Sequence, residues 1–274
     1  MATYCMIRPA PNSMNPISEI YPLLQQPRRV VIIMHQKPDA DAMGSSLGLS
    51  LFLRKLGHQT TVISPTNWAE WLKWMPGCAG VIDYEFSTEK AVAVLEQAEW
   101  IFCLDFNTLT RTRHMAPRLR KLPVQKILID HHQQPESAVF AYGVSDTEKS
   151  STSEMVYDVI VGSGHADKID IDIAACLYSG VMTDTGSFRF PGASSAVHRM
   201  VAVLKDTGLN HTKIFENLGF KLRVDAFDIL NHPNFAQPSG NTTSATFGQI
   251  TATRFAISDG GSSRQLQLSG KFSF

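Results

Sequence analysis

Acidic and imidazole side chains recur at the ends of three predicted strands and again after a predicted helix. They are His35, Asp39 and Asp41, then Asp105, then Asp130, His131 and His132, and finally Asp184. In an open α/β sheet the carboxyl ends of the strands form the ligand crevice, so these groups are expected to converge there. The sequence thus predicts one cluster of carboxylates and imidazoles, contributed by distant parts of the chain.

Carboxylates held close together repel one another and keep protons unless cations offset their charge. Two divalent ions would supply that positive charge. Aspartate oxygens combined with histidine nitrogens suit Mn²⁺ first and Mg²⁺ as the alternative. The four cysteines lack CxxC spacing, so they predict neither a zinc cluster nor a disulfide framework.

Each member of the cluster also has a purely structural interpretation. An aspartate after a strand, such as Asp105, is commonly a helix cap or a turn former. Asp39 and Asp41 fit an Asx turn, and the pair His131 and His132 fits a surface loop. The occurrence of all of them at successive strand ends is what favours the metal site.

Short apolar runs alternate with helical patterns from about residue 28, which predicts a doubly wound α/β domain with a mainly parallel sheet. The predicted strands are residues 29–34, 59–64, 100–104 and 125–129. The predicted helices before Ala141 are 44–56, 89–97 and a basic helix at 111–121, with helical spacing also at 68–75. After Ala141 the pattern is helical, with a capping box at 151–154 that opens a helix to 160, and further helices at 169–182, 196–205 and 211–218.

The chain of 274 residues carries 25 Lys and Arg against 25 Asp and Glu, and 43% of its residues are hydrophobic. This apolar content is enough for a core, and the balanced charge argues against a clamp on duplex nucleic acid. The longest aliphatic run, 30–34, is far shorter than the roughly 20 residues of a membrane helix. The first residues show no apolar signal segment, so we expect a cytoplasmic protein without a membrane partner. The oligomeric state, a dimer included, stays open.

The composition changes near Gly219. Residues 219–274 are rich in Asn, Ser, Thr, Gly and Phe and poor in charge, and residues 264–274 alternate between apolar and polar positions. A period of two predicts a strand with one apolar face. We therefore expect one domain at 1–218 and an atypical β-rich segment at 219–274 that is not a complete domain.

Four motifs taken together resemble those of the DHH phosphoesterases. They are His35-x-x-Pro-Asp39-x-Asp41-Ala-x-Gly44-Ser45, Leu104-Asp105, Asp130-His131-His132, and Thr183-Asp184-Thr185-Gly186 with Phe188-Arg189. The resemblance covers about residues 20–218 in the family's motif order. It is nearest to the small oligoribonuclease and 3′-phosphoadenosine-5′-phosphate phosphatase group, relatives of the RecJ exonuclease, and it implies a phosphoesterase that uses two Mn²⁺ ions.

The resemblance also implies a role for each acid and imidazole. The implied ligands are His35 and Asp39 for one ion, Asp41, His131 and Asp184 for the other, and Asp105 as the bridge between them. His132 would contact the phosphoryl oxygen. Two ions held side by side would orient the attacking and leaving oxygens of an in-line displacement, which agrees with the charge argument above.

Three further polar residues extend this interpretation. Asp130 is expected to orient its neighbours rather than to bind metal. Arg189 and Arg111 are candidate phosphate contacts, because a guanidinium group matches the geometry of a phosphate. Arg111 lies on the predicted basic helix, so we favour a solvated surface side chain at that position.

Small and aromatic residues near the motifs have two interpretations each. Gly44, Ser45 and Ser46 fall at a predicted helix start, where they could hold an anion or simply cap the helix. Phe188 and Phe190 could stack on a base. We expect these two phenylalanines to pack in the core instead.

The segment after residue 218 departs from the family pattern. Relatives of this group carry a smaller second domain with a Gly-Gly-Gly-His-type loop, and the stretch 259–262 lacks the histidine. Residues 224–235, 246–250 and 264–274 instead resemble the C-terminal end of a TonB-dependent receptor-type β-barrel. Such barrels need about eight strands or more and this segment has room for about four, so we interpret it as a fused fragment.

The main hypothesis is a Mn²⁺-dependent phosphoesterase that hydrolyses short oligoribonucleotides or 3′-phosphoadenosine 5′-phosphate. A related inorganic pyrophosphatase is the nearest enzymatic alternative. Because the family shares substrate recognition with its second domain, a catalytically impaired metal- or nucleotide-binding fusion protein is an alternative of another class. A third is that the tail directs insertion into an outer membrane.

Overall fold

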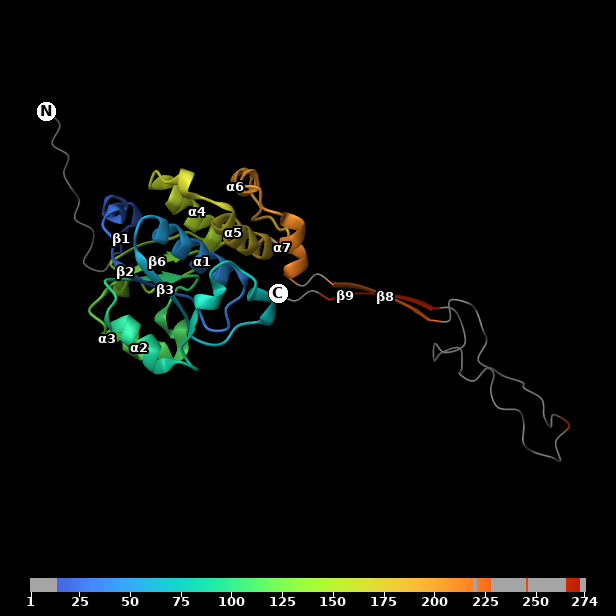
Figure 1. The fold of residues 1–274 in the computed structure, drawn as a ribbon, viewed down its shortest axis with the longest axis horizontal. Coiled ribbons are helices and arrows are strands. Elements are labelled where there is room, and N and C mark those ends of the chain that lie inside the picture. Colours follow the sequence, from blue (N-terminus) through green and yellow to red (C-terminus); the bar gives the residue numbers. More distant parts are fainter. Residues whose placement is uncertain (1–13, 219–220, 228–244, 246–264, 272–274) are drawn as a thin grey trace. The chain divides into compact units, whose positions relative to one another are not determined.

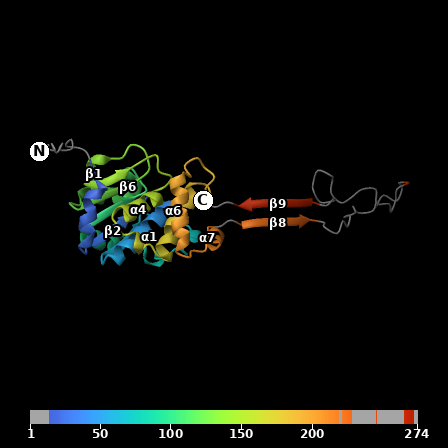
Figure 2. The same cartoon turned by 90° about the horizontal axis from the view of Figure 1, so that it is seen from above.

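The computed structural model describes residues 14–218, 221–227, 245 and 265–271. Contacts between residues divide the chain into two compact units, and the division follows Leu218. The first unit holds the large sheet, the helices and every site residue singled out above (Figures 1 and 2).

Seven parallel strands form the sheet of the first unit. In spatial order they are β1 (Asn15–Pro16), β7 (Tyr142–Ser145), β6 (Gln125–Asp130), β5 (Trp100–Leu104), β2 (Arg29–Ile33), β3 (Gln59–Ser64) and β4 (Ile82–Asp83). Every neighbouring pair runs parallel, and Val30 of β2 lies opposite Thr60 of β3 and Trp100 of β5. The predicted doubly wound α/β fold is confirmed.

Within residues 14–218, seven α-helices and six 3-10 turns connect and cover these strands. The helices are α1 (Ala40–Lys55), α2 (Thr88–Glu96), α3 (Ala116–Lys121), α4 (Thr152–Gly162), α5 (Ile171–Asp184), α6 (Ser195–Asp206) and α7 (His211–Asn217). The 3-10 turns are η1 (Ile17–Gln25), η2 (Glu70–Leu72), η3 (Cys78–Gly80), η4 (Leu109–Met115), η5 (Ser137–Val139) and η6 (Ala166–Lys168). Across the described part of the chain, none of the helices has the length and apolar character that crossing a membrane requires.

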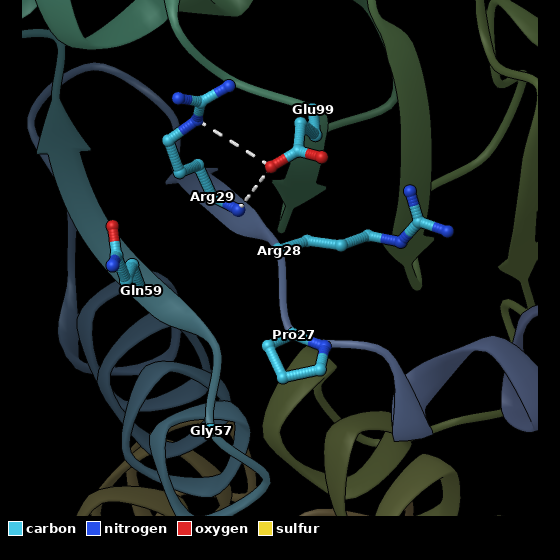
Figure 3. A pocket seen from close by; sticks show the side chains of 6 residues that line it. All are labelled: Pro27, Arg28, Arg29, Gly57, Gln59 and Glu99. Atoms are coloured by element: carbon cyan, nitrogen blue, oxygen red, sulfur yellow. Dashed lines mark hydrogen bonds and ion pairs between the residues drawn. The ribbon is translucent and has the colours of Figure 1, made fainter.

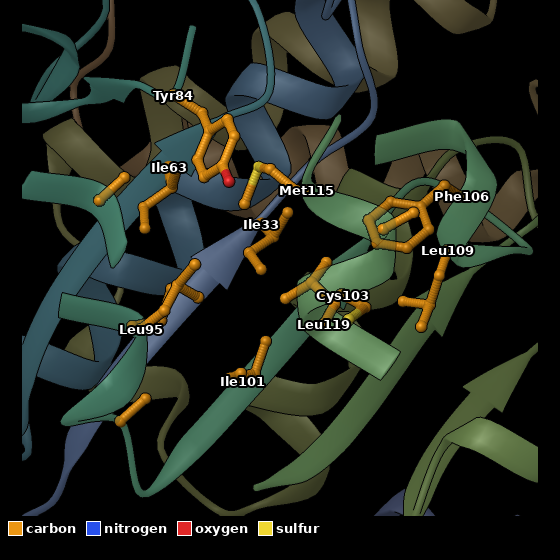
Figure 4. Packing of buried hydrophobic residues seen from close by; sticks show 14 of the residues in the cluster. Ile33, Ile63, Tyr84, Leu95, Ile101, Cys103, Phe106, Leu109, Met115 and Leu119 are labelled. Carbon is orange, nitrogen blue, oxygen red and sulfur yellow. The ribbon is translucent and has the colours of Figure 1, made fainter. Parts of the chain in front are cut away.

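Both faces of the sheet are buried at its centre, which is why β5 and most of β2 are continuous apolar runs. All five residues of β5 are buried. On one face, Ile33, Ile101 and Cys103 pack against α2 and α3, which contribute Leu95 and Leu119 (Figure 4). Complete burial of an aliphatic side chain of this kind stabilises a fold by roughly 1.5–3 kcal/mol, so this layer fixes the positions of the strand ends.

The opposite face carries α1, α4 and α5 (Figure 1), and small residues let these helices approach closely. A Cβ atom on Gly44 of α1 would collide with the carbonyl oxygen of Cys176 in α5. A Cβ atom on Gly180 of α5 would lie 2.5 Å from Oδ1 of Asp41. The two glycines therefore allow the start of α1 and the second half of α5 to lie side by side.

The order of the strands reverses between β2 and β5. From β2 the chain adds β3 and β4 in one direction, and from β5 it adds β6 and β7 in the other. The loops that follow β2 and β5 diverge at such a switch point and leave a crevice outside the strand ends. The carboxyl ends of β2, β5 and β6 meet there, and these are the ends that carry the predicted site residues.

Helix α1 begins at Ala40, four residues before the predicted start. The side chain of Asp39 is the N-cap that sets this boundary, since it accepts hydrogen bonds from two amides of the first turn. Gly44, Ser45 and Ser46 therefore lie inside the helix, and the interpretation of these residues as a helix-start anion site or cap is wrong. The hydroxyl of Ser45 instead donates to a carbonyl of its own helix.

Other predicted elements need smaller corrections. The chain after Ala141 forms β7 before it turns helical, because residues 142–145 pair with β6. The helical spacing at 68–75 yields only the short turn η2. The predicted helix at 111–121 is η4 followed by α3, with a break where Arg113 adopts a φ of 55°. The capping box at 151–154 is confirmed, since the Ser151 hydroxyl accepts a hydrogen bond from the Glu154 amide at 3.1 Å.

The second unit contains a two-stranded antiparallel sheet. It pairs β8 (Lys221–Phe227) with β9 (Gln265–Lys271), so that Lys221 lies opposite Lys271. Strand β9 falls within the stretch 264–274 that the period of two predicts as a strand. The other stretches on which expectations for this segment depend, 228–235, 246–250 and 259–262, lie outside the described residues.

Candidate metal centre

Asp105 lies at the centre of the cluster. It follows β5 directly, and its backbone φ of 63° is left-handed, a conformation that aspartate tolerates better than most residues. The buried carboxylate directs its two oxygens to different imidazoles: Oδ2 lies 3.4 Å from His35 Nε2, and Oδ1 lies 3.4 Å from His131 Nε2. Because β2 and β6 flank β5, the two histidines reach Asp105 from both sides.

His35 and Asp39 lie on the β2 side of Asp105. Asp39 uses Oδ1 to cap α1, accepting from two amides at 3.0 Å each, and its Oδ2 lies 3.8 Å from His35 Nε2. The other ring nitrogen of His35, Nδ1, lies 2.8 Å from the carbonyl oxygen of Gln36 and donates to it. This hydrogen bond turns Nε2 toward the acids, which is the orientation a metal-binding histidine needs.

Asp41, His131 and Asp184 lie on the other side. Asp41 is fully buried, and both of its oxygens accept from the first amides of α4: Oδ2 from Thr152 at 2.6 Å and Oδ1 from Ser153 at 2.9 Å. The N-terminus of a helix has unpaired amides and a positive dipole end, so it stabilises a carboxylate. Asp184 is the last residue of α5, and its Oδ2 lies 3.6 Å from His131 Nε2.

A second chain of contacts joins Asp130, His132 and Arg111. Asp130 Oδ1 lies 2.8 Å from His132 Nδ1, and Arg111 Nη1 lies 3.1 Å from His132 Nε2. Because arginine only donates hydrogen bonds, His132 Nε2 accepts and Nδ1–H donates to Asp130. Arg111 is thus part of the site, and the expectation of a solvated surface side chain is wrong. The turn η4 replaces the predicted helix there and directs Arg111 inward.

Burial and mutual repulsion raise the pKa of two acids in the cluster. The pKa of Asp41 is raised to about 7, first by its burial and then by the charge of Asp105. The pKa of Asp184 is raised to about 10, first by burial and then by the charges of Asp41 and Asp105. Without cations Asp184 therefore stays protonated at neutral pH and Asp41 is only partly ionised, which is the behaviour expected of crowded acids.

Asp105 and its imidazole neighbours shift in the opposite sense. Burial alone would raise the pKa of Asp105, but the hydrogen bonds from His131 and His35 outweigh it and hold that pKa well below its usual range. Burial opposes a charged His131, yet Asp105 and Asp41 raise its pKa to about 9. The pKa of His35 is raised for the same reason, against its burial. Protonated imidazoles therefore supply positive charge that divalent cations would otherwise provide.

The ligand atoms fit divalent cations in number, type and spacing. Three overlapping groups each offer three ligand atoms within 4.8 Å of one another: His35 with Asp39 and Asp105, Asp105 with His131 and His132, and Asp41 with His131 and Asp184. Carboxylate oxygens and imidazole nitrogens suit Mn²⁺ or Mg²⁺. The sulfur of Cys103 belongs to the apolar layer against α2 and α3, so it lies apart from this ligand set.

The structure thus brings together the six residues predicted as metal ligands and His132. Their individual roles stay predictions. Arg189 is exposed, and its Nε donates to the Gly186 carbonyl at 2.7 Å, just past Asp184. A contact between Arg189 and a phosphate also stays a prediction.

The two phenylalanines after α5 have different surroundings. The ring of Phe188 packs edge-on against Tyr178, with 5.7 Å between ring centroids. Phe190 is 57% exposed, so the expectation that it packs in the core is wrong. Gly186, Ser187 and Phe188 all have left-handed φ angles, and the ring of Phe190 folds back over this turn, where it lies 2.5 Å from the place of a Cβ atom on Gly186.

Sequence reasoning missed the contribution of Thr152 and Ser153. The capping box predicts a helix start at this position but gives no sign of what its free amides contact. Their partner, Asp41, lies more than one hundred residues earlier in the chain. Only the three-dimensional structure shows that the first amides of this helix face a buried acid.

Hollows lie at both ends of the strands, at their amino ends and at their carboxyl ends. A cavity of about 360 Å³ at the amino ends of β2 and β3 is lined in part by Arg28, Arg29 and Glu99, and Arg29 pairs with Glu99 there at 3.6 Å (Figure 3). A larger groove of about 710 Å³ begins at His132, at the carboxyl ends of the strands, and continues past Ser145. His132 is the member of the cluster that lines this groove, at the edge where β6 ends.

A family model described as the DHH family, N-terminal domain, matches residues 29–181. The chain belongs to the DHH family. The matched range contains the first three motifs, and Asp184 of the fourth lies three residues beyond it. A second model, described as an outer membrane beta barrel domain, matches residues 201–267. Part of that match falls on α6 and α7, so the resemblance of the tail to a TonB-dependent receptor has no support from the described residues.

Three relatives place the chain within the family. It is 28% identical over 207 residues to the bifunctional oligoribonuclease and PAP phosphatase NrnA of Thermus thermophilus, covering 75% of this chain and 57% of the relative. It is 26% identical to a probable manganese-dependent inorganic pyrophosphatase of Streptococcus mutans, over 73% of this chain and 65% of the relative. The crystal structure of an exopolyphosphatase-related protein from Bacteroides fragilis matches with a TM-score of 0.72 and 35% identity, covering 74% of this chain and 59% of that one. The chain thus spans little more than half the length of the first of these relatives.

Proposed function

We propose that this chain is a divalent-metal phosphoesterase that hydrolyses short oligoribonucleotides or 3′-phosphoadenosine 5′-phosphate. The position of Asp105 is the observation that carries the proposal. One of its oxygens faces His35 and the other faces His131, and the two imidazoles belong to separate groups of ligand atoms. This arrangement supports Asp105 as the carboxylate that two ions would share.

We infer two Mn²⁺ ions rather than Mg²⁺. Each group of ligand atoms contains an imidazole nitrogen, and Mg²⁺ is usually bound through oxygen ligands alone. The relative from Streptococcus mutans is itself named as manganese-dependent. Two dications would also offset the repulsion that raises the pKa of Asp41 and Asp184.

When bound by these acids and imidazoles, such ions would lower the pKa of the attacking water and offset the charge that develops on the phosphoryl group. The chain contributes orientation and further positive charge. Asp130 holds the tautomer of His132, which presents Nε2 toward Arg111. An entering phosphate oxygen would take the place of Nε2 as the acceptor for Arg111, and its guanidinium would then stabilise the negative charge.

The surroundings of the site suit a short nucleotide. The groove that begins at His132 has uncharged polar side chains in its lining, among them Gln133, Gln134, Ser137 and Ser145, together with apolar residues and one acid, Asp146. Such groups offer hydrogen bonds to a ribose and a base. A formal net charge of zero gives no extended basic face for a duplex. The relative from Thermus thermophilus is named as an oligoribonuclease and PAP phosphatase, which agrees with this substrate class.

The test is a hydrolysis assay with the purified chain and Mn²⁺. A labelled ribotrinucleotide, 3′-phosphoadenosine 5′-phosphate and inorganic pyrophosphate are supplied separately. We expect Mn²⁺-dependent release of a mononucleotide or of phosphate from one of the first two, and a loss of about a hundredfold or more in Asp105→Asn, which keeps the size of the side chain but removes its charge. Asp167→Asn, a change at an exposed carboxylate paired with Lys168, is the matched control. Full activity in Asp105→Asn would refute the proposal.

The same assay separates the alternatives. Preference for pyrophosphate would favour the second candidate, an inorganic pyrophosphatase, which the relative from Streptococcus mutans supports. Mn²⁺ binding without turnover of any substrate would favour the impaired metal-binding protein. That outcome is expected if activity needs the part of the relatives that this chain does not span, and Mn²⁺ would then raise Tm by mass action alone.

A further inference from the structure

The N-terminus of α4 contacts two acids of the cluster that come from different elements. Thr152 is fully buried, and its hydroxyl lies 3.0 Å from Oδ1 of Asp105. Its amide lies 2.6 Å from Oδ2 of Asp41. We propose that Thr152 is a positioning residue that fixes the Asp105 carboxylate for metal binding, an inference that rests on the proposed metal-dependent function.

The direction of the hydrogen bond supports this role. An ionised carboxylate only accepts hydrogen bonds, so the Thr152 hydroxyl is the donor. Oδ1 of Asp105 is also the oxygen that faces His131, at 3.4 Å. Donation from Thr152 prevents rotation of the carboxylate about its terminal bond and keeps Oδ1 on the His131 side and Oδ2 on the His35 side. Partners that orient a ligand in this way commonly change metal affinity by about 10–100-fold when removed.

The surrounding packing holds Thr152 in place. The next amide, from Ser153, donates to Asp41 at 2.9 Å, so α4 is anchored to the start of α1 by two hydrogen bonds. Gly180 of α5 lies against Ser153, where a Cβ atom would be 2.9 Å from that of Ser153. These contacts hold the backbone of Thr152 in place. Its hydroxyl reaches Asp105 because α1, α4 and α5 pack together at this point.

The experiment compares Thr152→Val, which removes the hydroxyl and keeps the shape, with Thr152→Ser, which keeps the hydroxyl. Mn²⁺ alone is titrated into chelator-treated protein, and free Mn²⁺ is measured by its electron paramagnetic resonance signal. We expect Thr152→Val to raise the Kd for Mn²⁺ about tenfold and Thr152→Ser to stay within about twofold of the wild type. The spectrum of bound Mn²⁺ reports directly on whether the ions share a bridging ligand.

Thr60→Val is the control for loss of a threonine hydroxyl contact away from the site, at a half-buried position. Its hydroxyl lies 2.7 Å from that of Ser50, at the amino end of β3 and far from the site. We expect this variant to lose some stability in thermal unfolding but to bind Mn²⁺ as the wild type does. Circular dichroism checks that each variant is folded.

Three outcomes would overturn the inference. Thr152→Val with the Kd and spectrum of the wild type would show that the hydroxyl does not position Asp105. Thr152→Ser as weak as Thr152→Val would assign the effect to packing. Both results leave the proposed function intact. Absence of Mn²⁺ binding by the wild-type protein would instead refute the metal-dependent function, and the role of Thr152 with it.

Discussion

The close approach of α5 to the N-terminus of α4 predicts a sharp effect for Gly180→Ala. The added methyl group would lie 2.5 Å from Asp41 Oδ1 and 2.9 Å from Ser153 Cβ, and it would collide with the Ser153 hydroxyl. Asp41 is held by two amides of α4 and cannot move aside without losing those hydrogen bonds. The substitution therefore forces apart the helix ends that hold Asp41.

The expected change in the free energy of unfolding of Gly180→Ala is the difference between two opposing effects. Overpacking a core costs about 1–3 kcal/mol, and a site fixed on both sides belongs near the upper value. Alanine favours a helix over glycine by roughly 1 kcal/mol, so the free energy of unfolding should fall by about 2 kcal/mol in total. In a domain of this size Tm changes by roughly 2–4 °C per kcal/mol, which gives a decrease of about 4–8 °C.

Thermal unfolding measures this decrease, and a Mn²⁺ titration of chelator-treated protein measures the displacement of Asp41. Gly48→Ala is the matched control, because its methyl group would meet the flexible end of the Leu177 side chain at 2.7 Å. The control should change Tm less and leave the Mn²⁺ affinity unaltered. Wild-type Tm together with wild-type Mn²⁺ affinity in Gly180→Ala would refute the reasoning.

Two further predictions concern Arg111 and His58. Arg111→Met removes the donor to His132 Nε2 and should lower kcat/KM about tenfold or more in the hydrolysis assay, because a hydrogen bond from a charged group is worth roughly 1.5–3 kcal/mol. The pKa of His58 is lowered, first by burial and then by the charge of Arg28. Its Nδ1 accepts a hydrogen bond from the Arg28 amide, and its Nε2 donates one to the Leu24 carbonyl. The neutral imidazole is thus preferred in the folded state, so its contribution to stability is complete above about pH 6.5 and is lost as pH falls through the lowered pKa. Urea unfolding from pH 8 to pH 5 should show a smaller loss of stability in His58→Gln than in the wild type.

Each of these two predictions has a clear control and a contrary result. Arg113→Met removes a neighbouring arginine that is exposed and paired with Glu85, and it should leave kcat/KM unchanged. Equal activity in both arginine variants would exclude Arg111 from the site's chemistry. Identical pH profiles of stability in His58→Gln and the wild type would show that His58 does not titrate differently in the folded and unfolded states.

The strands and the candidate ligands were predictable because both depend on local sequence. The inner residues of β2, β5 and β6 form apolar runs, 30–33, 100–104 and 127–129, since these strands are buried on two faces. Polar residues that directly follow such a run lie at the carboxyl edge of a parallel sheet. The sequence alone therefore assigns Asp105 and His131 to one crevice.

Boundaries and secondary contacts were predicted less well, for reasons that are visible in particular residues. The start of α1 depends on the Asp39 side chain, and a mostly apolar helix pattern does not reveal which polar residue caps it. Strand β7 contains Gly143 and few apolar residues, and it is a strand because it pairs with β6. Phe190 is apolar but exposed, since its ring folds back over Gly186 at the surface and does not enter the core.

The sequence by itself determined the sheet, the family and the acids and imidazoles that meet at one edge, because apolar periodicity and residues at strand ends are properties of neighbouring positions. The tertiary structure alone decided which groups surround that cluster. Thr152 reaches Asp105 and Asp41 across long stretches of chain, and Arg111 reaches His132 through a turn that replaces a helix. Such contacts arise from the packing of helices against one another, and no local pattern of residues specifies them.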